Sequence, residues 1–228
     1  MSRGFRYPSC PQVSPPRASP SSITARLIGQ LVRIGRHCFR QRIVVGAAGL
    51  ALGMLVVHPR NLFGEFEPLA SLLSLTLVLI GLALRAWAAA AAGLHTRTGT
   101  IEAPRLATGG PYAFVRNPIY LGSFLLGLGM IGLLRDPWLL VPHSLVFAVF
   151  FGMIVPAEEQ FLEARFGAEF MHFRRDVPKL VPSLRPWAGR KRRALTWRAA
   201  RGEVWIALLL VLIYLAFHAL LFLQSRPA

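Results

Sequence analysis

The sequence predicts an all-α integral membrane protein with about five transmembrane helices. Hydrophobic residues make up 54% of the 228 positions and charged residues only 16%, so a soluble domain would have too little polar surface to cover its core. Five apolar stretches approach the roughly 17–25 residues that a spanning helix requires. The Lys and Arg residues, which give a formal charge of +16, cluster between these stretches rather than along one soluble face.

The predicted spans divide the chain into four regions. The five spans are expected at residues 43–57, 67–94, 119–134, 138–157 and 204–223. The first and third are short, so they need flanking residues or a thinned bilayer. We expect a basic, partly disordered segment over 1–42, a membrane core over 43–182, a basic interfacial segment over 183–203 and a C-terminal transmembrane region over 204–228.

The positions of the basic residues orient the predicted helices. Segments 1–42, 95–118 and 158–203 hold 22 of the 26 Lys and Arg residues. By the positive-inside rule these segments, including the N-terminus, are cytoplasmic. The resulting expectation is a protein of the bacterial inner (plasma) membrane that contacts anionic lipid and binds no nucleic acid. Cys10 and Cys38 lack metal-ligand spacing, so we expect free thiols and no metal site.

The stretch GGPYAFVRNPIYLG, residues 109–122, is the most unusual local pattern. Its glycines and prolines predict a fixed turn followed by a helix that begins near Pro118. Spans three and four are joined only by residues 135–137, so they form an antiparallel hairpin. The hairpin brings Glu158 and Glu159 to the same membrane depth as Arg116. Two adjacent carboxylates need a cation or hydrogen-bond donors there, and Arg116 and a positively charged ligand are both candidates.

Each of these features also has a plain structural interpretation. Arg116 can snorkel from a helix start, and a Glu pair at a helix end can face water. Tyr112 and Tyr120 are consistent with an interfacial aromatic belt. Arg85, inside the second span, is either a functional group or a structural ion-pair partner within the helix bundle. The isolated histidines of the apolar spans, His143 and His218, are interpreted as packing residues.

The combination of motifs resembles the isoprenylcysteine carboxyl methyltransferase family, together with related phospholipid methyltransferase-type bacterial membrane methyltransferases. The resemblance covers residues 75–182 and rests on TGGPYxxxRNPxYxG at 108–122, EExxLxxxFGxEF at 158–170 and VPxLVP at 177–182. It implies a membrane enzyme with a cytoplasmic-side pocket for S-adenosyl-L-methionine. The family usually has histidine where Asn117 stands and a base where Asp176 stands, which leaves the substrate open.

The resemblance also implies roles for particular residues. Arg116 would hold an anionic acceptor against the methyl group, with Glu159 and Arg175 as further catalytic candidates. The implied cofactor-binding residues are Pro104, Arg105, Leu106, Ala107, Tyr112, Asn117, Pro118, Ile119, Tyr120 and Glu158. A cofactor with a sulfonium, an ammonium and a carboxylate suits a site that holds both acidic and cationic groups.

The sequence predicts methyl transfer to a lipophilic or membrane-associated acceptor. An isoprenylcysteine-like carboxylate, a phospholipid amine and a thiol all remain open as that acceptor. Two other classes remain open for the protein itself: an NADPH-dependent membrane reductase of the sterol-reductase type and a non-catalytic membrane protein. Charges within the spans are sparse, which disfavours a transporter. The oligomeric state is open.

Overall fold

The computed structural model describes residues 66–93, 105–191 and 194–224, and within them the chain is helical and contains no strand. The predicted basic segment 1–42 with Cys10 and Cys38, the first span at 43–57 and Pro104 lie outside the described residues. The elements are α2 (Glu67–Ala92), η3 (Gly110–Ala113), α3 (Pro118–Leu134), η4 (Pro137–Leu139), α4 (Leu140–Phe166), α5 (Ala168–Asp176), η5 (Trp197–Ala200) and α6 (Arg201–Gln224).

Three helical segments of the described chain are long and apolar enough to cross a membrane. They are Glu67–Ala92, Pro137–Phe166 and Trp197–Ala219, each with a mean hydropathy of at least 2.0. Helix α3 is apolar but has only 17 residues, as the short third stretch predicts. The all-helical membrane class and the second to fifth apolar stretches are therefore confirmed in the part of the chain that the structure describes.

Two helices extend beyond the apolar stretches that predict them. Helix α4 runs through Pro156 to Phe166 rather than stopping at 157, so Glu158 and Glu159 lie on the helix itself. Helix α6 begins at Arg201, inside the segment predicted to be interfacial. Its early start has a physical reason, since Glu203 is buried and pairs with Arg85 of α2. The first turn of α6 is thus held within the bundle.

Helices α2 and α3 pack closely because α3 presents glycines to its neighbour. A Cβ atom at Gly122 would lie 2.8 Å from the carbonyl oxygen of Gly81, and one at Gly129 would lie 2.6 Å from that of Ser74. Small residues allow the two backbones to approach this closely. Close packing matters in a membrane because helices there associate through van der Waals contact and not through the hydrophobic effect. The glycines thereby fix α3 against α2.

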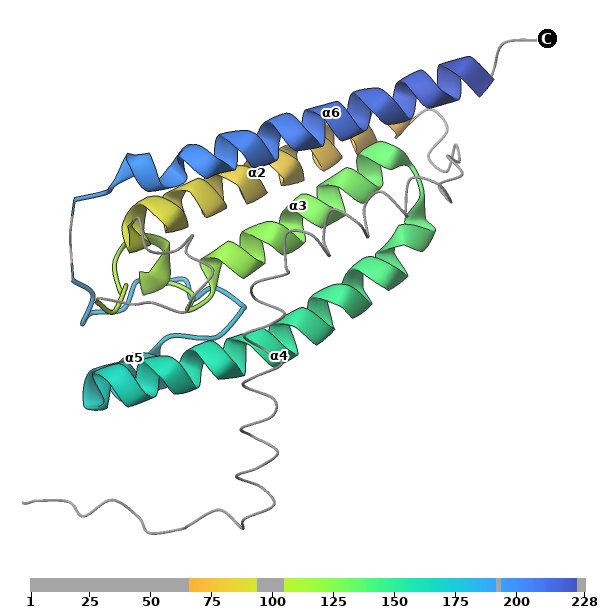
Figure 1. Ribbon diagram of the computed structural model, residues 1–228. Helices are drawn as coiled ribbons and strands as arrows, with labels where there is room; N and C mark the ends of the chain where they lie inside the picture. Colours follow the sequence, from red (N-terminus) through yellow and green to blue (C-terminus); the bar gives the residue numbers. More distant parts are fainter. Residues whose placement is uncertain (1–65, 94–104, 192–193, 225–228) are drawn as a thin grey trace, which may run out of the picture.

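The helices form a bundle that opens toward one end. Figure 1 shows α2, α3 and α6 running side by side, while α4 diverges from α3 and α5 extends its line. The α3–α4 connection is tight, as predicted: Arg135 adopts a left-handed conformation (φ 57°), and the Asp136 carboxylate accepts a hydrogen bond from the backbone N–H of Trp138 at 3.0 Å. The ion pair between Arg135 and Glu67, at 2.5 Å, ties this connection to the start of α2.

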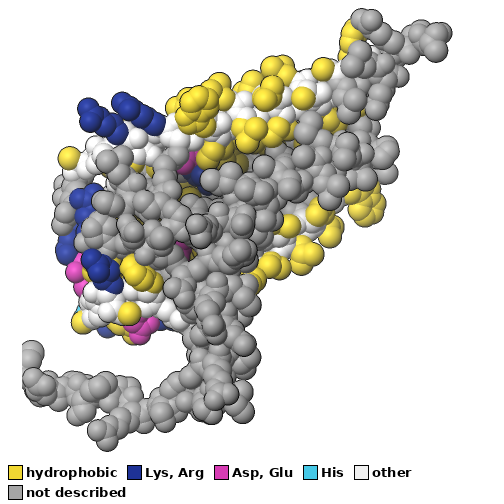
Figure 2. All heavy atoms as spheres, viewed as in Figure 1, with side chains coloured by type: hydrophobic (Ala, Val, Ile, Leu, Met, Phe, Trp, Pro, Cys, Tyr) yellow, Lys and Arg dark blue, Asp and Glu magenta, His cyan; other side chains and the backbone are white. Residues whose placement is uncertain are grey.

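The charged residues gather at the opposite end of the bundle. Figure 2 shows Lys and Arg side chains concentrated there, while hydrophobic side chains cover the length of the helices. Segments 105–117 and 177–191 meet at this basic end through backbone hydrogen bonds. The predicted grouping of these two basic segments is confirmed in the described residues, and their cytoplasmic location stays a prediction.

Candidate functional site

The turn before α3 is shaped by two glycines. Gly110 has a positive φ of 59°, and a Cβ atom there would lie 3.1 Å from the indole nitrogen of Trp87. A Cβ atom at Gly109 would lie 2.6 Å from the backbone oxygen of Lys191. A larger residue at either position would meet neighbouring groups, and at Gly110 it would also be strained. The glycines let the turn fit between α2 and the segment that follows α5.

Segment 177–191 is fastened across this turn by hydrogen bonds. The donors and acceptors, with their distances, are Arg116 N to Pro178 O at 2.9 Å, Ser183 N to Phe114 O at 2.9 Å, Trp187 N to Ala113 O at 2.8 Å, Lys191 N to Thr108 Oγ1 at 3.1 Å, and Asn117 Nδ2 to Lys179 O at 3.0 Å. Two loops far apart in sequence therefore form one irregular but hydrogen-bonded layer over the ends of α3 and α4.

A charged cluster lies beneath this layer, around Glu159. The Glu159 side chain is 9% exposed and faces three cations: Arg116 at 3.4 Å, Arg174 at 3.7 Å and Lys179 at 3.9 Å. The predicted meeting of Arg116 with the Glu pair is seen for Glu159, which Arg116 contacts, and their shared membrane depth stays a prediction. The side chain of Arg116 is only 11% exposed, which disfavours simple snorkelling into water.

The Arg116–Glu159 pair is incompletely satisfied. The Arg116 guanidinium donates from Nη1 to the carbonyl oxygen of Arg174 at 2.5 Å. Its Nε atom and the Oε1 atom of Glu159 are buried and have no hydrogen-bond partner among the described residues. Burial lowers the pKa of Arg116, while the negative charge of Glu159 opposes this shift and the positive charge of Arg174 adds to it. Glu159 Oε1 faces Arg116 Nη2 at 3.4 Å, so Arg116 Nε is the atom left without any polar contact in the described part of the chain. Buried polar atoms normally find partners, so this N–H points to a ligand or a bound water.

Glu158 lies beside the cluster but makes different contacts. Its Oε1 atom accepts a hydrogen bond from the Tyr120 hydroxyl at 2.9 Å. Burial, followed by the negative charge of Glu158, raises the pKa of Tyr112 well above its usual range. Tyr112 therefore stays neutral, and its hydroxyl remains available as a donor. The structure thus groups one carboxylate with two tyrosines, three of the residues expected to bind cofactor.

The other residues expected to bind cofactor divide into two sets. Arg105, Leu106 and Ala107 line a cavity of about 20 Å³ together with residues 108–110, Ala91, Lys191 and Leu195; that volume suits roughly one water molecule. Asn117 and Pro118 are buried at the start of α3. The Ile119 carbonyl oxygen faces Arg85 Nη1 at 3.5 Å. All of these residues line the same end of the bundle.

Arg175 is the predicted site residue that the structure does not bring to the cluster. Its side chain is 72% exposed and pairs with Asp176 at 2.9 Å. Hydrogen bonds from Arg175 and from the Trp187 indole lower the pKa of Asp176. The neighbouring Arg174 contacts Glu159 instead, because successive residues of α5 project from different sides of the helix. Sequence reasoning also missed Lys179, which the VPxLVP motif contains.

The polar network around Arg85 is the second feature that sequence reasoning left unresolved. Arg85 Nε donates to Glu203 at 2.7 Å and Nη2 donates to the same carboxylate at 3.3 Å. Arg85 Nη1 also donates to the Ser123 hydroxyl. The ion-pair interpretation of Arg85 is therefore confirmed. Glu203 was detectable in principle, since an acidic residue at the start of an apolar run requires a partner.

Fold and site together define a helical membrane protein with an acid–base cluster at the basic end of an apolar hairpin. Residues 69–169 match the family described as phospholipid methyltransferase. Three similar proteins are named protein-S-isoprenylcysteine O-methyltransferase. The one from Schizosaccharomyces pombe is 38% identical over 34% of this chain and 33% of its own length, and the one from Xenopus laevis is 30% identical over 50% of this chain and 41% of its own length. Form B from Arabidopsis thaliana is 31% identical over 47% of this chain and 57% of its own length.

The predicted family resemblance is thus confirmed. Over the segment that carries the motifs, the chain is similar to the phospholipid methyltransferase family and to proteins named protein-S-isoprenylcysteine O-methyltransferase. It spans about one third to three fifths of the length of these curated relatives. No solved structure gives a significant match to the chain.

Proposed function

We propose that this chain transfers a methyl group from S-adenosylmethionine to a lipophilic, membrane-associated acceptor that presents a carboxylate, as an S-isoprenylcysteine does. The names of the relatives support the reaction class, and the family match favours a methyltransferase over a reductase. The observation that carries the proposal is the buried guanidinium of Arg116, whose Nε–H has no hydrogen-bond partner among the described residues. A guanidinium N–H that is left open is suited to hold a carboxylate oxygen.

The donor set of the site fits S-adenosylmethionine, which supplies an electrophilic methyl group on a sulfonium. Glu158, held by Tyr120, offers a carboxylate for the ammonium or a ribose hydroxyl. The neutral Tyr112 offers a hydroxyl donor on the same side. The Asn117 amide nitrogen already donates one hydrogen bond to Lys179, which leaves its second N–H and its amide oxygen for the cofactor. Arg105, Leu106 and Ala107 would complete the contacts, as the family resemblance implies.

Arg116 would hold the acceptor, and Glu159 would hold Arg116. In the reaction an acceptor oxygen forms a bond to the methyl carbon as the sulfur–carbon bond breaks, so a negative and a positive charge are both neutralised. An ionised acceptor needs no general base, and positioning supplies most of the acceleration. The cluster presents three cations to two carboxylates, because Arg174 pairs with Glu163 at 3.2 Å as well as with Glu159. This arrangement suits an anion better than an amine, which would first have to lose a proton.

Entry of the cofactor would require a local opening. The cavity beside Arg105 is about 20 Å³, far below the roughly 300–1,000 Å³ of small-molecule sites. Lys191 and Thr108 both line this cavity, and the Lys191 backbone N–H donates a hydrogen bond to the Thr108 hydroxyl oxygen, which holds the cavity closed. We therefore infer that the segment ending at Lys191 moves away from Gly109 when the cofactor binds.

The test is a transfer assay in membranes that contain the overproduced protein. Methyl-labelled S-adenosylmethionine is supplied with N-acetyl-S-farnesylcysteine, or with phosphatidylethanolamine for comparison. Base-labile label should appear on the prenylcysteine and be absent without the protein. Arg116→Lys keeps the charge but loses the planar fork, so turnover should fall about tenfold or more. The matched control is Arg185→Lys, at an exposed position outside the cluster, which should retain full activity.

Two results would contradict the proposal. Label on phosphatidylethanolamine alone would assign the site to an amine acceptor. Full activity in a folded Arg116→Lys variant would remove the geometric role of the guanidinium and return Arg116 to a structural position.

A further inference from the structure

An open groove lies between α2 and α6, apart from the candidate methyl-transfer site. Its volume is about 430 Å³, within the range of small-molecule sites. The lining residues are Leu82, Ala83, Ala86, Trp197, Ala200, Arg201, Glu203, Val204 and Ala207. None of them belongs to α3, α4, α5 or segment 177–191, which form the methyl-transfer site. The groove is therefore a separate feature of the molecule.

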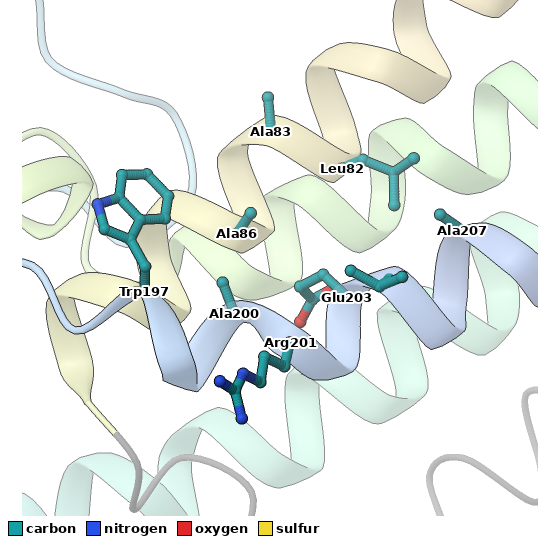
Figure 3. Close-up of a pocket in the computed structure, with 9 residues that line it drawn as sticks. Leu82, Ala83, Ala86, Trp197, Ala200, Arg201, Glu203 and Ala207 are labelled. Carbon is teal, nitrogen blue, oxygen red and sulfur yellow. The ribbon is translucent and has the colours of Figure 1, made fainter.

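The sequence makes this groove by placing small residues on facing helices. Ala83 and Ala86 of α2 lie opposite Ala200 and Ala207, and Figure 3 shows their short side chains around the hollow. The surroundings are apolar: Leu79 on α2 and Leu208 on α6 are more than half exposed. Exposed leucines on helices long enough to span a membrane face lipid chains. The groove is thus open to the acyl region of the bilayer.

The polar groups of the groove lie near one end. Figure 3 shows Trp197 at one end of the hollow, with Leu82 and Ala207 at the other and Arg201 between. Trp197 is 59% exposed, and such tryptophans favour the headgroup level of a membrane. This end of α6 belongs to the basic end of the bundle, so the groove runs from the headgroup level into the hydrocarbon.

The charge of the lining selects the kind of lipid. Glu203 is a lining residue, but its carboxylate is neutralised by Arg85 at 2.7 Å. Arg201 is exposed, as is Arg198 three residues earlier. Neither arginine forms an ion pair with any carboxylate among the described residues. The groove is therefore apolar, with one lining guanidinium, that of Arg201, which has no carboxylate partner in the part of the chain that the structure describes.

We propose that this groove binds one anionic phospholipid, with an acyl chain along Ala83, Ala86 and Ala207 and the phosphate near Arg201. The bound lipid would cover the seam between α2 and α6 and would shield the Arg85–Glu203 pair from the bilayer. This inference does not rest on the proposed methyl transfer, because lipid binding is measured without cofactor or acceptor.

The test is native mass spectrometry of the full chain, delipidated in detergent and titrated with dioleoylphosphatidylglycerol or dioleoylphosphatidylcholine. The wild type should retain phosphatidylglycerol in preference to phosphatidylcholine. Arg201→Gln should weaken phosphatidylglycerol binding about fivefold, the effect of one basic residue near a lipid surface. Arg185→Gln removes the same charge at an exposed position outside the groove and should leave binding unchanged.

A second variant tests the trough independently of the charge. Ala83 is exposed, so Ala83→Leu fills the groove without entering the core and should reduce retention of the lipid. Ala148→Leu, on an exposed position of α4, is the matched control and should not.

Three outcomes would overturn the proposal. Equal retention of the two lipids would remove the phosphate contact. Equal losses in Arg201→Gln and Arg185→Gln would show diffuse attraction by net charge. A dimer of the chain that Ala83→Leu dissociates would assign the groove to a second copy.

Discussion

Replacement of Glu203 by glutamine should destabilise the protein more than the same replacement of Glu67, the carboxylate paired at the other end of the bundle. The Arg85 and Glu203 side chains are 15% and 9% exposed and lie 2.7 Å apart. Removing one partner of a buried pair typically costs about 3–5 kcal/mol, because the other charge remains without compensation. Arg85 keeps its bonds to Ser123 and Ile119, so we expect the lower end, about 3 kcal/mol.

The assay is thermal unfolding in detergent, followed by tryptophan fluorescence. For a chain of this size about 1 kcal/mol shifts the midpoint by about 2–4 °C, so Glu203→Gln should lower it by roughly 6–12 °C. The control is Glu67→Gln at the other end of the bundle, whose partner Arg135 is 43% exposed. Glu67 itself is 15% exposed, but water can solvate the Arg135 guanidinium that remains. The cost should therefore approach the roughly 0–1 kcal/mol of a surface pair, which predicts a shift of at most a few degrees.

A double variant separates the missing charge from the missing contacts. Replacing both Arg85 and Glu203 by methionine removes both charges and retains apolar volume, which is often neutral for a buried pair. The double variant should therefore unfold closer to the wild type than Glu203→Gln does. If the double variant is no more stable than Glu203→Gln, or if Glu203→Gln behaves like Glu67→Gln, the reasoning about this network is wrong.

Two further predictions concern packing and the site. Gly127→Ala should lower the unfolding midpoint by several degrees, because a Cβ atom there would collide with the His143 ring and overpacking costs about 1–3 kcal/mol. The control is Gly152→Ala, which has open space around it and should not lower the midpoint. Arg174→Ala should reduce methyl transfer more than Arg175→Ala because only Arg174 contacts Glu159, and the reverse order in the labelled-methyl assay would restore the role that the sequence assigns to Arg175.

Much of this architecture follows from the sequence because its causes are local. Apolar length predicts the helices, and Pro118 marks the start of α3 because proline suits the first helical position. The short connection at 135–137 predicts the hairpin, and the hairpin brings Arg116 to Glu159. These steps need only chain geometry and the cost of unpaired charge.

The remaining features depend on contacts that sequence spacing does not encode. Glu203 lies 118 positions from Arg85, so nothing local identifies the pair. Arg174 and Arg175 are adjacent and chemically identical, and only the rotation of α5 decides which one contacts Glu159. The early start of α6 follows from the same pair, since partnering lets a charged residue enter the helical bundle.

Binding of S-adenosylmethionine tests the central claim most directly. Calorimetric titration of the detergent-purified protein should show saturable binding of S-adenosylmethionine and none of NADPH. Glu158→Ala removes the carboxylate held by Tyr120 and should weaken this binding about ten- to a hundredfold, the scale of a charged hydrogen bond. Glu67→Ala, at the other end of the bundle, where the carboxylate pairs with Arg135, should leave it unchanged. Binding of NADPH instead, or equal affinities in the two folded variants, would contradict the account.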